Sequence, residues 1–382
     1  MSREDTLPSG IYPNEPGSYW LPDDLDKLLV WAVEQKASDI TLLPGRAPGC
    51  RINGAWVEVA KRPVSADEIM GLVDSLARSP AASARLKGAE DIDFAHEVRV
   101  DRQTRHRFRV NATACRDGWG TGANLVLRTI PAHPPDLDDL GVQADLVRHL
   151  FPQNGLVLVT GVMGSGKSTL LSATLRRIIE QDQRMVLTYE APIEFDLMTL
   201  PLARSFVVQS EIPGQLRDFA RAPRNAARRA ADVILVGESR DKETLRSMIE
   251  AAEIGVAAYS TVHTRSVADT LSRIINVFPI DEQPGIAATL ISAIRLIIQQ
   301  RLVPKADGTG RTALIEYLAF GESERRQLMG EPPRTLSLAT QRLIEDKGND
   351  LLTVARRMFD AGVISQDTFR PIESERTVDE SR

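Results

Sequence analysis

The segment GVMGSGKS at residues 161–168 constrains the fold of this chain more than any other stretch. It follows the apolar run LVLVT and leads into the helical pattern STLLSATLRRII. The glycines let successive backbone N–H groups point into one concavity, and the helix N-terminus adds positive potential there. A strand, a glycine-rich loop and a helix in this order predict an α/β domain with a phosphate-binding site at the loop.

The pattern G-x-x-x-x-G-K-[S/T] assigns separate tasks to two residues of this loop. We expect Lys167 to contact the β- and γ-phosphates of ATP and Ser168 to supply a hydroxyl ligand to Mg²⁺. The alternative is a glycine-rich turn with an exposed lysine. The predicted binding residues are Gly161, Val162, Met163, Gly164, Ser165, Gly166, Lys167, Ser168 and Thr169.

Short apolar runs alternate with helical patterns in this half of the chain. Strands that are apolar on both faces, with helices between them, indicate a parallel sheet covered on both sides. Ligands of such open sheets bind at the carboxyl ends of the strands. The runs are LVLV (156–159), MVL (185–187), VILV (233–236) and VAAYSTV (256–262).

Candidate catalytic side chains follow three of these runs. Glu238 comes just after VILV, where a carboxylate beside the phosphate loop can orient or deprotonate the attacking water. Its alternative is a structural ion pair with Arg240 or Arg246. His263 ends the segment STVHT, although a lone histidine is more often a structural hydrogen bonder. Glu190 ends a strand in TYEAPIEF (188–195), which either closes that strand or brings a second carboxylate to the same edge.

The N-terminal third has a different pattern, with mixed helices and antiparallel hairpins. Asn53-Gly54 between alternating segments predicts a hairpin, and SADE at 65–68 is a capping box that predicts a helix start. PAHPPDLDDLG (131–141) is a proline-rich connection and the expected hinge. The predicted organisation is a flexible tail (1–20), an N-terminal domain (21–130), a linker (131–145), a nucleotide-binding domain (146–330), a C-terminal helical segment (331–370) and a disordered tail (371–382).

Composition excludes several classes of protein. The formal net charge of −5 gives no support for binding nucleic acid, so we do not expect nucleic acid as a direct ligand. Two cysteines fit a reducing compartment and exclude a disulfide scaffold. No signal peptide is visible, and the apolar run AATLISAIRLII is too short to span a bilayer. We therefore expect a cytoplasmic protein that reaches a membrane only through partners.

The motifs, in their order and spacing, resemble the secretion-superfamily ATPases typified by the pilus-retraction ATPase PilT. The resemblance covers roughly residues 25–365 and is carried by ASDITL, RFRVN, LRTIP, GVMGSGKST, YEAPIEF, ILVGESRD, TVHT, RIINVFP and QRLVP. TYEAPIEF, SEIP and the lack of a cysteine-rich zinc module are similar to the DotB and conjugative TraJ branch.

This resemblance implies a PAS-like N-terminal domain joined to a RecA-like ATPase domain, assembled as a homohexamer with nucleotide sites between subunits. It implies that Glu238 is the catalytic glutamate, that His263 and Glu190 belong to the family's His and Asp boxes, and that Arg109 and Arg128 reach the nucleotide from the N-terminal domain. Two further groups match the family, the box glutamate Glu194 and the paired arginines Arg224 and Arg228. Ala191 stands where the Asp box usually has aspartate, so the role of that carboxylate passes to Glu190 or is absent.

The resemblance implies an ATP hydrolase that powers a type IV secretion or conjugal transfer machine, with membrane-anchored components of that machine as partners at the inner membrane. Pilus retraction is the alternative within the class. An alternative of another class is a scaffold that binds nucleotide to assemble and does not hydrolyse it.

Overall fold

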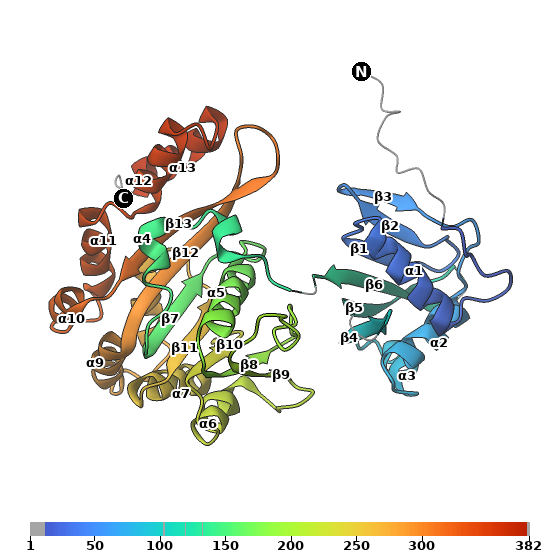
Figure 1. The fold of residues 1–382 in the computed structure, drawn as a ribbon, viewed down its shortest axis with the longest axis horizontal. Coiled ribbons are helices and arrows are strands. Elements are labelled where there is room, and N and C mark those ends of the chain that lie inside the picture. The colour runs from blue at the N-terminus through green and yellow to red at the C-terminus, as the bar shows by residue number, and fades with distance from the viewer. Residues whose placement is uncertain (1–11, 102–103, 119, 132, 380–382) are drawn as a thin grey trace. The chain divides into compact units, whose positions relative to one another are not determined.

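The computed structural model describes residues 12–101, 104–118, 120–131 and 133–379. The chain divides into two compact units, unit 1 (Met1–Ala132) and unit 2 (His133–Arg382). Figure 1 shows both, and each is described by itself.

Unit 1 is built on an antiparallel sheet in the order β3-β2-β1-β6-β5-β4. The apolar faces of α1 and α2 pack on it and enclose its core. Its elements are α1 (Pro22–Glu34), β1 (Asp39–Leu42), β2 (Gly49–Ile52), β3 (Ala55–Glu58), α2 (Ala66–Leu76), α3 (Ala82–Lys87), β4 (Ile92–Arg99), β5 (Arg105–Arg116) and β6 (Thr121–Ile130).

Two local predictions in unit 1 are confirmed. Asn53-Gly54 joins β2 to β3, with Ile52 paired to Ala55 across the turn. Ser65 caps α2: its Oγ accepts from the Glu68 N–H at 3.3 Å, and the Glu68 carboxylate accepts the Ser65 N–H at 2.8 Å. The reciprocal bonds satisfy two backbone donors that the first turn of a helix leaves free.

Replacing Ser65 by alanine is expected to destabilise unit 1 by about 1 kcal/mol, because the cap bond to the Glu68 N–H is lost. All four tryptophans of the chain belong to unit 1, so tryptophan fluorescence during urea unfolding reports on this unit. Ser75→Ala, the same change at an exposed position of α2, is the matched control. Equal midpoints for Ser65→Ala and Ser75→Ala would contradict the capping role.

The predicted flexible tail is wrong for residues 12–20, while residues 1–11 lie outside the described chain. Tyr12 and Trp20 are both only 2% exposed. The Tyr12 N–H donates to the Val59 carbonyl at 2.7 Å, and its ring packs against Trp20 and against the edge of Trp31. The proline- and glycine-rich composition of this segment gave no sign that Tyr12 and Trp20 are buried, because their burial depends on residues distant in sequence.

Unit 2 holds a seven-stranded sheet in the order β13-β12-β7-β11-β10-β8-β9, all parallel except β13. Its elements are η1 (Leu137–Leu140), α4 (Ala144–Val147), β7 (Gly155–Thr160), α5 (Lys167–Gln181), β8 (Met185–Glu190), β9 (Phe206–Glu211), η2 (Phe219–Arg221), α6 (Ala222–Ala227), β10 (Val233–Val236), α7 (Lys242–Glu253), β11 (Ala257–Val262), α8 (Val267–Ile275), α9 (Gln283–Ala293), β12 (Ile294–Pro304), β13 (Arg311–Ala319), α10 (Glu322–Leu328), α11 (Leu336–Asp346), α12 (Leu351–Asp360) and α13 (Gln366–Asp379).

Helices cover both faces of this sheet, which explains why its strands are apolar throughout. Val157 and Val159 of β7 share one core with α5, whereas Leu156 and Leu158 share another with α7, α8 and α9. Figure 1 shows α5 packed against the sheet and α10–α13 beside the β12–β13 pair. The predicted class, a mixed α/β N-terminal domain followed by an α/β domain with a mostly parallel sheet and C-terminal helices, is confirmed.

The apolar run AATLISAIRLII changes from helix to strand in its middle. Helix α9 ends at Ala293 and β12 begins at Ile294. None of the helices in the described part of the chain combines the length and apolar character needed to cross a bilayer.

The predicted linker, 131–145, is largely docked on unit 2; its residue 132 lies outside the described chain. Leu137 is 2% exposed in the core beside α5. Arg177 of α5 pairs with Asp136 and Asp138, each at 2.8 Å, and Arg176 donates to the Pro134 carbonyl at 2.8 Å. From Pro134 onward, an apolar side chain and two arginines fix the predicted linker to α5.

The prediction of a disordered tail from residue 371 is also corrected. Helix α13 continues through Pro371 to Asp379, and residues 380–382 lie outside the described chain. Phe369 stacks on Phe359 of α12, with ring centroids 5.2 Å apart, and Ile372 is 8% exposed. The polar composition of this stretch concealed the apolar side chains that hold the helix against α12.

Candidate functional site

The site lies where four neighbouring parallel strands of unit 2 end. Val262 of β11 is in register with Thr160 of β7, and Val236 of β10 is in register with Tyr189 of β8. The segments that leave these strands carry the phosphate loop, His263, Glu238 and the TYEAPIEF turn. The strand order therefore brings the predicted loop and the two glutamates to one edge of the sheet.

Lys167 opens α5 and is only 9% exposed. Its Nζ donates to the carbonyls of Gly161 at 2.8 Å and Val162 at 3.0 Å, so the side chain folds back over the loop. Burial lowers the pKa of Lys167, and the negative charges of Glu238 and Glu194 oppose that shift. The ammonium group is held at the concave side of the loop, where a phosphate group would approach it.

Two glycines of the loop are required by its geometry. Gly161 has φ 145°, and a Cβ there would lie 2.4 Å from the Gln300 carbonyl oxygen. Gly166 has φ 87°, and a Cβ there would lie 2.7 Å from the Gln300 amide nitrogen. Any side chain at either position would push the loop away from β12.

The Glu238 carboxylate contacts two side chains, those of His263 and Arg240. His263 Nε2 lies 2.6 Å from Glu238 Oε1, and the Arg240 guanidinium contacts the same oxygen. The sequence left a choice between catalysis and an Arg240 ion pair, and the structure has that ion pair at the edge predicted for catalysis. The histidine and the glutamate, 25 residues apart in sequence, thus form one pair beside the phosphate loop.

Glu190 lies deeper than the other carboxylates and is 7% exposed. Its Oε1 accepts from Thr188 Oγ1 at 2.6 Å and from Gln209 Nε2 at 3.1 Å. Burial raises the pKa of Glu190 above its ordinary value, and these two hydrogen bonds only partly offset the shift. Ionised Glu190 is therefore a cost to folding at neutral pH.

Replacing Glu190 by glutamine is expected to raise the unfolding temperature at about pH 8, with a gain that shrinks towards about pH 5. A raised folded pKa means that the native state binds the proton more tightly than the unfolded chain, so the wild type loses stability as pH rises through that pKa, and glutamine does not. Thr188 and Gln209 both donate to Oε1, so the amide oxygen of glutamine can accept these two bonds, although the carboxylate also accepts the Glu194 backbone N–H. Thermal melts across this range test the expectation, with exposed Glu243→Gln as the control, because the charge of Glu194 itself contributes to the raised pKa of Glu190. A constant difference at every pH would contradict it.

Glu194 is the carboxylate whose position the sequence left least certain. It is exposed on the turn after β8, and its charge acts on Lys167 together with that of Glu238. Ala191, which replaces the usual aspartate, is exposed on the same turn. Glu194 thus lies on the exposed turn, whereas Glu190 is buried at the end of β8.

The predicted arginines lie on other elements. Arg109 of β5 and Arg128 of β6 are exposed and directly opposite each other across the ladder. Arg128 Nε donates to the buried Asp39 carboxylate at 2.8 Å, which fixes the side chain on unit 1. Arg224 and Arg228 are exposed, on α6 and at its end in unit 2.

The residues present fit a nucleotide-bound magnesium ion. Ser168 is the second residue of α5, adjacent to the loop lysine, and its hydroxyl is partly exposed. Hydroxyl, carboxylate and phosphate oxygens are the ligands that Mg²⁺ prefers. In the described chain no three His, Cys, Asp or Glu side chains form a metal site of their own, so the nucleotide would supply most of the ligands.

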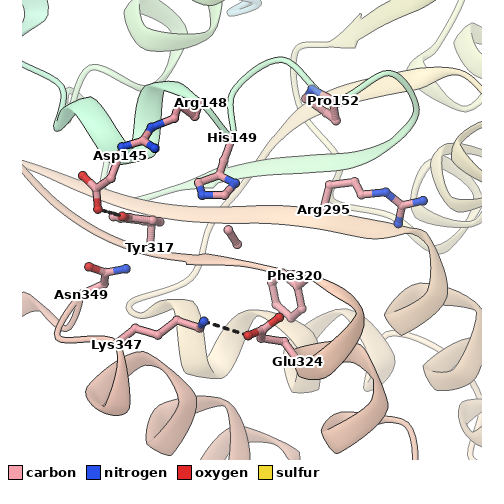
Figure 2. A pocket seen from close by; sticks show the side chains of 12 residues that line it. Asp145, Arg148, His149, Pro152, Arg295, Tyr317, Phe320, Glu324, Lys347 and Asn349 are labelled. Atoms are coloured by element: carbon pink, nitrogen blue, oxygen red, sulfur yellow. Dashed lines mark hydrogen bonds and ion pairs between the residues drawn. The ribbon is translucent and has the colours of Figure 1, made fainter.

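A separate hollow of about 520 Å³ lies at the opposite end of the strands (Figure 2). Pro152 precedes β7 and Arg295 is near the start of β12, so this is the amino edge of the sheet. Lys347 pairs with Glu324 at 2.8 Å; burial opposes ionisation, but the hydrogen bonds and charge of Lys347 help lower the pKa of Glu324 to about 2. These charges neutralise each other, and the hollow is distinct from the phosphate loop.

Comparison with known proteins agrees with this geometry. A family model described as type II/IV secretion system protein matches residues 15–357. The ATPase DotB of Legionella pneumophila is 38% identical, with a TM-score of 0.82 over 95% of this chain and 98% of that one. The retraction motor PilT with bound ADP is 30% identical, with a TM-score of 0.79 over 90% and 95%.

A comparison of sequences without structures gives the same result. The type IV pilus retraction ATPase PilT of Pseudomonas aeruginosa is 34% identical over 308 residues, which cover 81% of this chain and 86% of the relative. The match spans both units described above. The chain therefore belongs to the type II/IV secretion system protein family of P-loop ATPases, among the relatives of DotB and PilT.

Proposed function

We propose that this chain hydrolyses ATP and powers a type IV secretion or conjugal transfer machine. The observation that supports hydrolysis is the Glu238 carboxylate, which follows β10 and pairs with His263 at the sheet edge that also carries the phosphate loop. A nucleotide-binding scaffold needs the loop but not a carboxylate at this position.

The proposed mechanism assigns a role to each group at the edge. The loop N–H groups and Lys167 bind the β- and γ-phosphates. Glu238 orients water for in-line attack on the γ-phosphate and accepts its proton, while His263 holds the carboxylate in position at 2.6 Å. Glu190 lies buried at the end of β8, where its Oε1 accepts hydrogen bonds from Thr188 and Gln209 and helps to fix the turn that follows.

Magnesium would be held by Ser168 and the phosphates, and it would neutralise charge that develops on the phosphate oxygens. Arg109 and Arg128 are proposed to reach a nucleotide from unit 1 of a neighbouring subunit. This arrangement requires a ring, and we propose a homohexamer in the cytoplasm that docks on membrane-anchored components at the inner membrane.

The choice of secretion over pilus retraction rests on the likeness to DotB. DotB of Legionella pneumophila matches with higher identity and TM-score than the ADP-bound PilT structure, and Ala191 departs from the usual Asp box. Pilus retraction remains the second candidate, because the curated PilT covers four fifths of the chain at 34% identity.

Steady-state phosphate release from MgATP by the full chain tests the enzymatic part of the proposal. We expect sustained turnover that Lys167→Ala abolishes, which excludes a contaminating ATPase. Nucleotide binding without sustained release would instead support the assembly scaffold.

The biological part is tested in the source cell. Deletion of the gene is expected to abolish conjugal transfer or protein secretion and to leave twitching intact, with rescue by the wild type only. Loss of twitching alone would assign the chain to pilus retraction.

A further inference from the structure

Gln300 of β12 touches the phosphate loop at three places. Its side-chain Nε2 donates to the Ser165 carbonyl at 2.8 Å, and its own backbone and side chain limit the space at Gly161 and Gly166. The residue is 5% exposed. In the sequence, Gln300 begins the segment QRLVP, a family signature that by itself indicates no role for this residue.

Strand pairing on both sides of β12 fixes the backbone that carries the Gln300 side chain. Gln300 pairs with Ile315 of β13, and its neighbour Gln299 pairs with Thr160, the last residue of β7 before the loop. Side chains alternate along a strand, so Gln300 shares the α5 face with Ile298, whereas Gln299 points to the other face. The amide is therefore fixed relative to both ends of the loop.

We propose that Gln300 is a positioning residue for nucleotide binding. In a trans peptide the C=O and the following N–H point in opposite directions. By fixing the Ser165 carbonyl towards β12, Gln300 turns the Gly166 N–H away from β12, to the side from which phosphate is bound. The inference rests on the proposed nucleotide site and adds a residue that acts on it through the backbone.

A role in packing alone does not explain why residue 300 carries an amide rather than an apolar side chain. Gln300 Oε1 and Ser165 Oγ are buried and have no hydrogen-bond partner among the described residues. A buried polar atom without a partner costs stability, so an apolar side chain of the same size would serve packing as well. The amide N–H is the feature that methionine cannot replace.

Gln300→Met tests the donor at nearly constant volume, with ADP as the probe because its binding does not depend on hydrolysis. We expect the Kd for ADP, measured by calorimetry on the full chain, to rise about tenfold, which corresponds to about 1.4 kcal/mol. KM for ATP should rise with kcat little changed, because the loop binds ground state and transition state alike. The nucleotide-free unfolding temperature should stay within about 4 °C of the wild type.

Gln299→Met is the matched control, since Gln299 is 3% exposed on the same strand and faces away from the loop. It should leave ADP affinity unchanged. Wild-type affinity in Gln300→Met, or an equal loss in Gln299→Met, would overturn the positioning role. If the wild type itself binds no ADP, the proposed nucleotide site fails instead, so the two failures are distinguishable.

Discussion

Alanine in place of Arg128 is expected to reduce steady-state ATP turnover by about 10³–10⁵-fold, the range for loss of an arginine finger. Arg128 is exposed on β6 and anchored by buried Asp39 at 2.8 Å, so its guanidinium is presented in a fixed direction. Arg109 lies opposite it on β5, and Arg109→Ala should act in the same direction. Phosphate release and ADP affinity are measured together, and affinity should change far less than turnover.

Arg105→Ala is the matched control for these variants. It lies on the same strand as Arg109, and its guanidinium is paired with Glu97 at 3.2 Å. Wild-type turnover in Arg128→Ala and Arg109→Ala, or an equal loss in Arg105→Ala, would remove the arginines from the proposed mechanism.

The same model predicts that the site is shared between subunits. Mixing inactive Arg128→Ala with inactive Glu238→Gln should restore part of the activity, because some interfaces then combine an intact arginine with an intact glutamate. Specific activity of the wild type should also fall on dilution through the range where the ring dissociates. Activity that stays flat on dilution, with no recovery on mixing, would show that each subunit works alone.

Glutamine in place of Glu238 is expected to slow turnover by about 10²–10⁴-fold while MgATP still binds. Glutamine fills the same space but its amide cannot accept the proton of the attacking water. His263, 2.6 Å away, can still donate to the amide oxygen, so the position of the side chain should be kept. Phosphate release measures turnover, and calorimetry with the slowly hydrolysed substrate measures binding.

Glu243→Gln provides the control for Glu238→Gln. Glu243 is exposed in the first turn of α7, and the exchange removes the same charge five residues further along the chain. It should leave turnover near the wild-type value. Near wild-type turnover in Glu238→Gln would show that another group activates water.

Local patterns in the sequence were sufficient for much of the fold. The turn at Asn53-Gly54, the cap at Ser65 and the strand β7 before the phosphate loop all depend on residues close in sequence. The meeting of Glu238 and His263 at one sheet edge followed from the rule that parallel strands end together. These features follow from local sequence signals or from a general rule of sheet topology.

The errors arose where distant contacts decide the structure. Tyr12 is buried by Trp20 and Trp31, and Leu137 is buried beside α5. Tyr12 and Leu137 both lie in proline-rich segments, whose composition predicts an exposed, irregular backbone. The depth of Glu190 depends on Gln209 of the next strand in the sheet. Gln300 lies 135 residues from the carbonyl that it binds, so no local spacing could relate the two.

The docked segment 134–140 has a mechanical consequence. Pro134 and Asp136 are fastened to Arg176 and Arg177 of α5, the helix whose first residue is Lys167. Arg176 and Arg177 lie in the C-terminal half of α5, so a pull along the backbone from unit 1 would act on the part of this helix that is remote from Lys167.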